Sequence, residues 1–541
     1  MKRIIIIAII FSGISALYPV EFSGDITAEA AVTLNNGDML FNDNIFGFRI
    51  EHFTDDLYAV IRTQIIFRNY FRNPDDLGYT LQPGDISLFY NLYPLQISLD
   101  EAFLAFHDVL INGLDLTFGK QRISWGTADM LNPTDLLNPV DLSNPFDFSR
   151  RIPSVAINLQ YYLPFWDSYV QAVYQPYSQL AQLSPFYFDM LDKETITELK
   201  SFFGNTKFKD SATVWSFREI LPPEANITNG LFAFKYGFSL WGFDFSLNCV
   251  YRYNDFPVLT GLYMETDVTA VMDVSADIIA EFNIWTGETN IVTNIIEFSK
   301  KTESVDIKSR GYQLGYGREF EAGFDFARDF GIFLLWGEVG VFFPDKILSR
   351  AFGYADVDAD INTTAYITEI IRGQFTATTN YYITNFTVST NLGQNIDESV
   401  VAVSNEVYVR YTVGLDKMFD GGWYINCQYS HGLFTERGNW GPMRLQDYLV
   451  LLVQKSLFAD KFTVSLAGIL NVNTMGEMFK SENIADYFTE NHGYSVQLTL
   501  EYMPTLDIKI ETGGIYFDGR NAMMGKMKDY DSVFVRFSYM F

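Results

Sequence analysis

The chain has 541 residues, more than one soluble core usually holds, and 17% of them are aromatic whereas only 19% are charged. Its formal net charge of −28 argues against a nucleic-acid partner. No Ser/Gly/Pro-rich linker and no low-complexity block divides it. The chain is therefore either a large soluble β protein or a protein that faces lipid.

The first residues have the layout of a secretory signal peptide. Lys2 and Arg3 precede an apolar run over residues 4–11, and small residues follow up to Ala16. The run is too short for a membrane-spanning helix. We expect cleavage near Ala16, which leaves residues 17–541 as one exported domain. No later apolar run reaches 18 residues, so no helical membrane span is expected.

A conspicuous set of motifs covers residues 97–163. "ISLDEAFLAF" and "LDLTFGKQRISWG" have the composition of strands, and "LLNPVD" follows them. This stretch resembles a family of porin-like outer-membrane proteins with an acidic-Ala-aromatic strand, a Gly-Arg/Lys-Gln strand that ends in Trp-Gly, and an Asn-Pro-x-Asp loop. Distant relatives include polysaccharide-export and substrate-selective porins, and some members accompany exporters of lipids or hydrophobes. The resemblance implies a membrane β-barrel and does not identify a solute.

Residues 124–153, here called the Asn-Pro loop, contain Asn-Pro-x-Asp three times. Proline fixes φ in each turn, and Asn and Asp can bond to nearby backbone amides, so we expect a stiff strip. One hypothesis is that the loop folds into a pore and sets acidic against basic residues across it. The residues concerned are Arg122, Asp129, Asp135, Asp141, Asp147, Arg150 and Arg151. The alternatives are a rigid external cap and, less specifically, a calcium site.

Alternation with a period of two is clearest over residues 232–240 and 243–253. Phe, Tyr and Leu occupy one face of each segment, and polar residues occupy most of the other. This pattern predicts strands with one apolar and one wet side, and it returns near the end of the chain. The candidate lumen-facing residues are Asp244, Asn248, Arg252, Gln497, Glu501, Asp507, Lys509, Glu511 and Arg536. They either line a hydrated bore or form an internal network of ion pairs and hydrogen bonds that stabilises the barrel.

The links between the expected strands alternate between short and long. Short links lie near residues 53–56, 163–168, 240–243, 327–331, 419–422, 458–461 and 503–507, and aromatic residues cluster around several of them. Such alternation is typical of transmembrane antiparallel up-and-down β-barrels, with short periplasmic turns and long extracellular loops. Starting near 20–34, we expect about 18 strands in an all-β fold. Loops 255–309 and 344–401 leave room for extra hairpins, within a range of about 16 to 20 strands.

The chain ends in "SVFVRFSYMF". This end resembles the signal by which the barrel-assembly machinery recognises its substrates, and the resemblance implies that Phe537, Tyr539 and Phe541 carry it. We therefore expect two partners, the assembly machinery and outer-membrane lipid. The sequence leaves the oligomeric state open.

The remaining residue types give no sign of catalysis. Cys249 and Cys427 fall on apolar faces, which suits small hydrophobes better than a disulfide. The four histidines are not at metal-ligand spacing, and no hydrolase motif accompanies them, so we expect no enzyme, metal or cofactor. The function that the sequence favours is a passive channel for small or hydrophobic solutes. A surface adhesin or structural protein and the outer-membrane part of a lipid exporter are the alternatives.

Overall fold

The computed structural model describes residues 20–69, 94–144, 146–147, 149–183, 207–210, 216–221, 223–224, 226–283, 288–369, 375–391, 400–403, 405–438 and 444–541. The predicted signal peptide, residues 1–16, lies outside these ranges. No helix within them is long and apolar enough to span a membrane.

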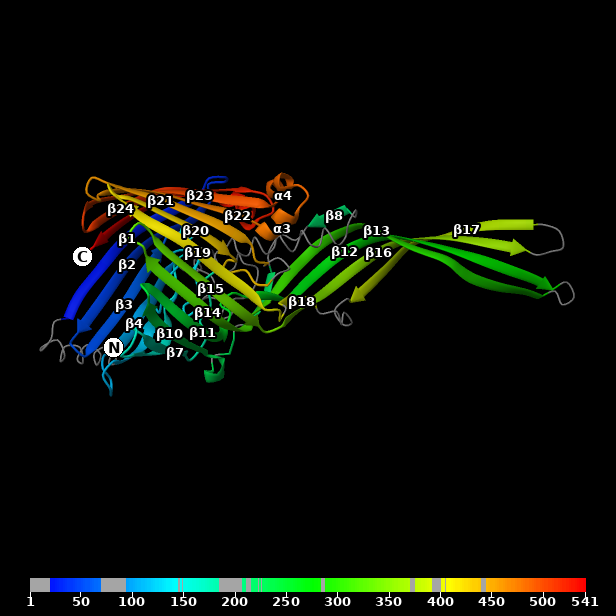
Figure 1. Ribbon diagram of the computed structural model, residues 1–541. Helices are drawn as coiled ribbons and strands as arrows, with labels where there is room; N and C mark the ends of the chain where they lie inside the picture. The colour runs from blue at the N-terminus through cyan, green and yellow to red at the C-terminus, as the bar shows by residue number, and fades with distance from the viewer. Residues whose placement is uncertain are drawn as a thin grey trace.

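Eighteen strands form one antiparallel sheet that closes into a barrel (Figure 1). Neighbours in the wall follow one another along the chain, as expected of an up-and-down barrel. The strands are β1 (Val20–Thr33), β2 (Met39–Phe53), β3 (Leu57–Arg68), β4 (Leu95–Phe106), β5 (Leu114–Gln121), β6 (Ser154–Tyr162), β7 (Tyr169–Gln175), β10 (Leu231–Leu240), β11 (Phe243–Tyr253), β14 (Arg318–Asp329), β15 (Leu334–Pro344), β19 (Tyr408–Phe419), β20 (Trp423–His431), β21 (Asp447–Leu457), β22 (Phe462–Val472), β23 (His492–Thr505), β24 (Ile508–Gly519) and β25 (Ser532–Met540).

The last strand closes the barrel on the first. β25 pairs antiparallel with β1 over Asp25↔Met540 to Thr33↔Ser532. Beyond the strand, the backbone N–H of Phe541 donates to the carbonyl of Gly24 at 2.9 Å. The predicted assembly residues Phe537, Tyr539 and Phe541 remain exposed at the outer surface of this seam.

Apolar side chains occupy the outward positions of the wall. Phe232 and Phe234 of β10 are about half exposed, whereas Ala233 and Lys235, which alternate with them, are buried. Cys249, on the same alternating face as Leu247 and Tyr251, is a free thiol, as is Cys427. An apolar band of this kind is what hydrocarbon requires of a membrane barrel. The expected separation of short turns from long loops is confirmed, except that the β1–β2 link, residues 34–38, is short at the long-loop end.

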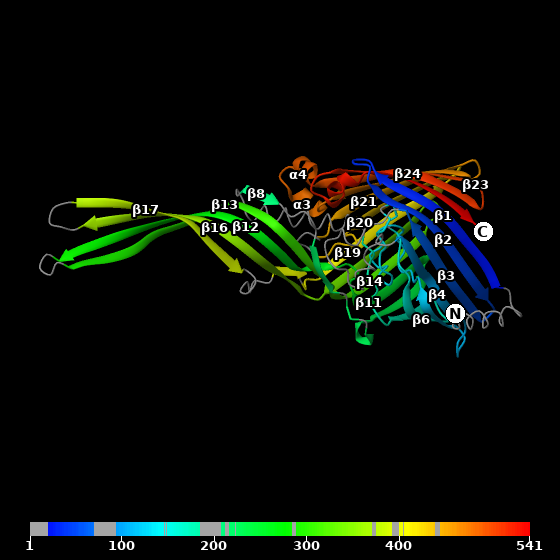
Figure 2. The same ribbon diagram turned by 180° about the vertical axis from the view of Figure 1, so that it is seen from behind.

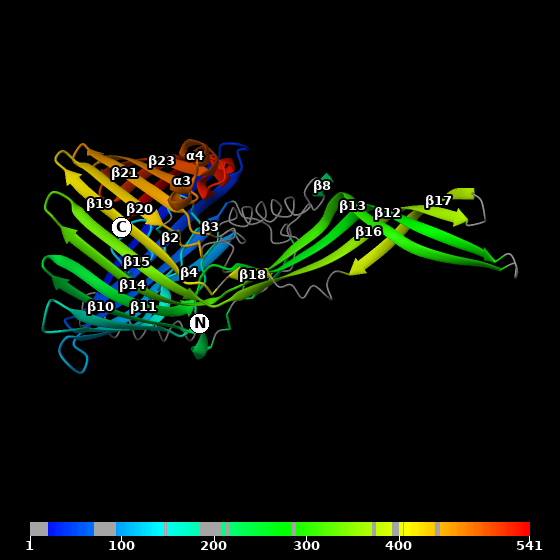
Figure 3. The same ribbon diagram turned by 45° about the vertical axis from the view of Figure 1, so that its right-hand side comes forward.

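Two of the long loops form hairpins, but these do not join the wall. A second sheet contains β8 (Lys207–Asp210), β9 (Ser216–Leu221), β12 (Val258–Asn283), β13 (Glu288–Gly315), β16 (Ile347–Glu369), β17 (Phe375–Asn391) and β18 (Val400–Val403). Its long strands β12, β13, β16 and β17, here called the arm, extend away from the long-loop end of the barrel (Figures 2 and 3). The barrel therefore keeps 18 strands, and residues 17–541 are not all part of it.

Short helices occur only in the loops of the described part. They are η3 (Ile227–Asn229), α3 (Met475–Lys480), α4 (Ile484–Asn491), α5 (Met523–Lys526) and η4 (Lys528–Tyr530). Asn483 begins α4, because its side chain accepts hydrogen bonds from the N–H groups of Ala485 and Asp486.

A buried carboxylate holds the loop between β20 and β21. Glu436 is 3% exposed and accepts hydrogen bonds from the N–H groups of Leu433 and Gln446, at 3.0 and 2.9 Å, and from the Tyr448 hydroxyl. Burial raises the pKa of Glu436 to about 7, although these hydrogen bonds oppose the shift. Between the two pKa values, Glu436 is therefore protonated in the native state and ionised in the unfolded chain.

This proton makes stability depend on pH. Because the native pKa is raised, the free energy of unfolding should fall as the pH rises from the unfolded carboxyl value of about 4.3 to the native value of about 7, by about 3 kcal/mol. Glu436→Gln should remove that fall, as thermal unfolding at pH 5 and pH 8 would show. An unchanged pH dependence in the variant would contradict the role of Glu436.

Candidate functional site

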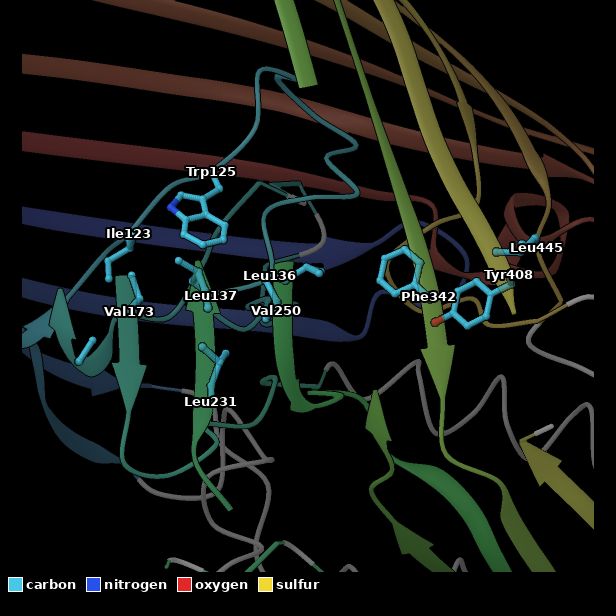
Figure 4. Close-up of a cluster of buried hydrophobic side chains, with 12 residues drawn as sticks. Ile123, Trp125, Leu136, Leu137, Val173, Leu231, Val250, Phe342, Tyr408 and Leu445 are labelled. Atoms are coloured by element: carbon cyan, nitrogen blue, oxygen red, sulfur yellow. The ribbon is translucent and has the colours of Figure 1, made fainter. Parts of the chain in front are cut away.

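The Asn-Pro loop lies inside the barrel. Trp125, near its start, is 1% exposed, and its indole N–H donates to Gln171 of β7 at 2.9 Å. Figure 4 shows Trp125, Leu136 and Leu137 of the loop beside side chains of the wall, among them Val173 of β7. The inner wall from β7 to β19 thus packs against an apolar cluster that the loop supplies.

The loop also reaches distant parts of the wall. Asp129 accepts a hydrogen bond from Asn426 of β20 at 2.9 Å, and the carbonyl of Leu131 accepts one from Thr412 of β19 at 2.9 Å. Phe146 packs against Phe41 of β2 and Phe534 of β25. Since these strands are spread around the barrel, the loop crosses the lumen. These contacts show that the loop folds into the barrel and does not form an external cap.

Glu338 of β15 fixes the first turn of the loop. Its carboxylate accepts hydrogen bonds from the N–H groups of Thr127 and Ala128, and from the Thr134 hydroxyl at 2.9 Å. It is 4% exposed, so these donors replace the water that the charge has lost. No sequence pattern indicates Glu338, because it lies about 200 residues from the loop and belongs to no motif.

The three Asn-Pro turns differ in what their asparagines bind. Asn132 closes its own turn, since its side-chain oxygen accepts from the N–H groups of Thr134 and Asp135 at 3.0 and 2.8 Å. The side-chain oxygen of Asn144 likewise accepts a hydrogen bond from the N–H of Phe146 at 2.9 Å. Asn138 instead accepts from the N–H of Ile123 at 2.7 Å and ties the middle turn to the end of β5. These bonds agree with the stiff strip expected from the sequence.

The charged residues of the loop region largely neutralise one another. Arg122 contacts both carboxylate oxygens of Asp135, and Arg151 lies 3.5 Å from the same group. Arg150 lies 3.2 Å from Asp141. The hypothesis of a transverse field placed the acidic and basic residues on opposite sides of the bore. Asp135 and Asp141 are instead in direct contact with the arginines.

Two acidic residues of the loop lie apart from these pairs. Asp147 accepts from the backbone N–H and the hydroxyl of Ser149, and Asp129 from Tyr424 and Asn426. Neither is within ion-pair distance of a cation among the described residues. Groups of three or more His, Cys, Asp or Glu suited to a metal ion are absent from the described ranges.

A row of charged side chains runs across β23, β24, β25 and β1 on the inner wall. Lys509 bridges Glu501 and Glu511 at 2.9 and 3.1 Å, and Arg536 bridges Glu29 and Glu511 at 2.7 and 3.4 Å. These five residues form one network, here called the charged row. Glu501, Lys509, Glu511 and Arg536 were predicted to face the lumen, whereas Glu29 was not predicted.

The other predicted lumen-facing residues lie in different surroundings. Arg252 is buried against Glu319 and Asp255, at 2.9 and 3.2 Å, and Asn248 is buried four residues before it on β11. Gln497 donates to the carbonyl of Phe146 at 3.2 Å. Asp244 bonds to Ser239 near the short-turn end of the wall.

Asp507 was placed wrongly on the lumen wall. It is an exposed residue of the turn between β23 and β24, where the pairing slips between Tyr502 and Thr505. β24 begins only at Ile508, so the alternation that places Lys509 and Glu511 on the inner wall does not extend back to Asp507.

The comparisons with known proteins give structural matches alone. No family model matches the chain, and no curated protein matches it. Among solved structures, it is similar to OccK9 of Pseudomonas aeruginosa and to OccAB4 of Acinetobacter baumannii. For both, the TM-score is 0.44 and the identity 8%, and the match covers 96% of this chain and 97% of the other.

A further similar structure is Wzi of Escherichia coli, described as a carbohydrate-binding β-barrel involved in group 1 capsule assembly. Its TM-score is 0.40 and its identity 9%, over 98% of this chain and 86% of Wzi.

Proposed function

We propose that the protein is an outer-membrane channel of porin type, through which small solutes diffuse past the Asn-Pro loop. The observation that carries the proposal is the loop itself, which is hydrogen-bonded to β7, β15, β19 and β20 across the lumen. A stiff loop held inside a polar barrel narrows the bore and selects what passes. The signal-peptide layout and the apolar outer band support the location.

The solute path runs along the charged row. Trp125, Leu136 and Leu137 of the loop pack against the wall from β7 to β19, where Arg252 is only 6% exposed. On the other side, Lys509 and Arg536 keep 30% and 25% of their side-chain surface exposed. Exposed charges of both signs suit a hydrated passage, because they can replace the hydration of a polar solute.

Net charge in the bore favours cations. The ion pairs cancel the charges of Asp135 and Asp141, which leaves Asp129 and Asp147 as the acidic residues of the loop outside the described ion pairs. Fixed negative charge in a narrow bore raises the local concentration of cations. Passage is by diffusion, with no covalent step.

A second candidate function is adhesion at the cell surface. The arm favours it, because β12 and β13, of 26 and 28 residues, extend well beyond the end of the barrel (Figure 1). A channel does not require such an extension. Loss of attachment to host or neighbouring cells after deletion of the arm, with the channel current unchanged, would assign adhesion to it.

The attachment of the loop to Glu338 can be tested by current recording. Glu338→Ala leaves buried donors of the loop unpaired, at a cost of about 1–3 kcal/mol, so the loop should spend more time displaced. The refolded variant in a planar bilayer should then show larger and noisier single-channel currents than the parent chain. Asp244→Asn, which lies away from the loop, is the matched control. No current from either the parent or the variant would contradict the channel.

Ion selectivity tests the charge assignment. In a salt gradient, the reversal potential of the parent chain should show cation preference, and Asp129→Asn should reduce it by removing an unpaired charge. Asp38→Asn, an exposed change in the β1–β2 link, should leave it unaltered. Anion preference in the parent chain would contradict the proposal.

A further inference from the structure

Three basic side chains lie on the outer, lipid-facing surface of the barrel near its short turns. They are Arg328 of β14, Lys417 of β19 and Lys455 of β21, here called the basic patch. Alternation along each strand places them with exposed apolar residues, such as Leu415 two positions before Lys417 and Leu451 four positions before Lys455. Because β14, β15, β19, β20 and β21 are successive neighbours in the wall, the patch occupies one sector of the barrel.

The outward positions around the basic patch carry no compensating acid. In the short-turn half of the described wall strands, the pairing places no Asp or Glu on the outer face. The outward aspartates of the wall, Asp447 and Asp518, lie at the long-loop end. The whole chain has 66 acidic and 38 basic residues, so a surface of average composition would hold more acids than bases. The positive sign of this sector is therefore a local property that opposes the charge of the chain.

Arg328 lies against two rings of the aromatic belt. Its guanidinium carbon is 4.6 Å from the ring centroid of Phe243 and 4.7 Å from that of Phe330. Attraction to the ring faces holds the cation at the surface and leaves its N–H groups able to donate to an anion. Among the described residues, no carboxylate lies within ion-pair distance of Arg328.

Lys417 and Lys455 lie over rings of the same belt. The Nζ atom of Lys417 is 4.8 Å from the ring centroid of Phe419, and that of Lys455 is 4.9 Å from the centroid of Trp423. Phe419, Trp423 and Lys455 are direct partners in the pairing of β19, β20 and β21, so they form one row. Lys455 also donates to the carbonyl of Gly421, which leaves two of its three N–H groups.

The position of the basic patch in the membrane indicates which anion it meets. Basic side chains on a lipid-facing wall extend to the headgroup level, because their charge is costly in hydrocarbon. The short turns of a membrane barrel are periplasmic, and those of this sector lie at the end of the barrel away from the arm (Figure 3). Phospholipid headgroups at that level carry phosphate. Arginine binds phosphate through its forked N–H groups, and lysine binds it as a compact charge.

We infer that the basic patch binds the phosphate of an anionic phospholipid in the periplasmic leaflet, while the acyl chains lie along the apolar outer residues of β14 to β21. Neighbouring strands are about 4.8 Å apart, so the three cations follow one another at steps of about 10 Å across the wall. A zwitterionic headgroup offers the same phosphate but adds a cation that the patch repels, so a headgroup of net negative charge is preferred. The inference does not rest on the proposed channel, because it concerns the outer surface.

Removal of the three charges in the full chain tests the inference. The patch variant replaces the basic patch by glutamine and combines Arg328→Gln, Lys417→Gln and Lys455→Gln. The matched control removes three charges from exposed lysines at the long-loop end and combines Lys346→Gln, Lys480→Gln and Lys528→Gln. A basic residue beside an anionic lipid surface contributes about fivefold in affinity, so the patch variant should bind phosphatidylglycerol about a hundredfold more weakly. The control should bind it as the parent chain does.

The readout is the mass of the intact protein with its bound lipids, released from micelles that contain phosphatidylglycerol and phosphatidylcholine. Heat-modifiable migration on a gel confirms that each barrel is folded, and current recording of both variants separates a failed lipid site from a failed channel. Equal retention of the two lipids by the parent chain, a preference that the patch variant keeps, or an equal loss in both variants would overturn the inference. Lipopolysaccharide retained by the parent chain in place of phosphatidylglycerol, and lost from the patch variant, would also overturn it.

Discussion

The structure depends on one constraint, that every backbone N–H and C=O group in hydrocarbon must have a partner within the protein. A sheet meets this condition only when its last strand pairs with its first. Here β25 and β1 make that seam, and it ends in the hydrogen bonds between Gly24 and Phe541. Closure also permits the exposed Phe, Tyr and Leu residues of the outer surface, because lipid rather than water covers them.

Closure creates an interior that the chain fills unevenly. Trp125, Leu136 and Leu137 of the Asn-Pro loop pack against the wall from β7 to β19, and Leu131 and Phe146 pack against strands on the other side. The charged row keeps part of its side-chain surface exposed. The ion pairs of Asp135 and Asp141 hold the loop together rather than acting on a solute. Glu338 and Asn426 hold the loop, whereas the proposed solute path follows the partly exposed charges of the charged row.

The sequence predicted those features that depend on neighbouring residues. Alternation located β10 and β11, and the lengths of the links predicted a barrel of about 18 strands, the number that the structure has. Features that depend on distant pairing could not be predicted. The parallel pairing of β12 with β16 forms a sheet outside the barrel, and no local pattern signals it. Glu338 was missed for the same reason, and Asp507 was misplaced because it belongs to the turn that precedes β24.

The central claim, that the Asn-Pro loop crosses the lumen, is tested most directly by a disulfide between the loop and the far wall. Asp129 and Asn426 are in contact at 2.9 Å, and Cys249 and Cys427 can be replaced by alanine to leave no other thiol. The account predicts that Asp129→Cys with Asn426→Cys forms an intramolecular disulfide in the membrane under mild oxidation. A folded barrel whose two cysteines both stay free, with the loop cysteine open to a large reagent added outside, would contradict it.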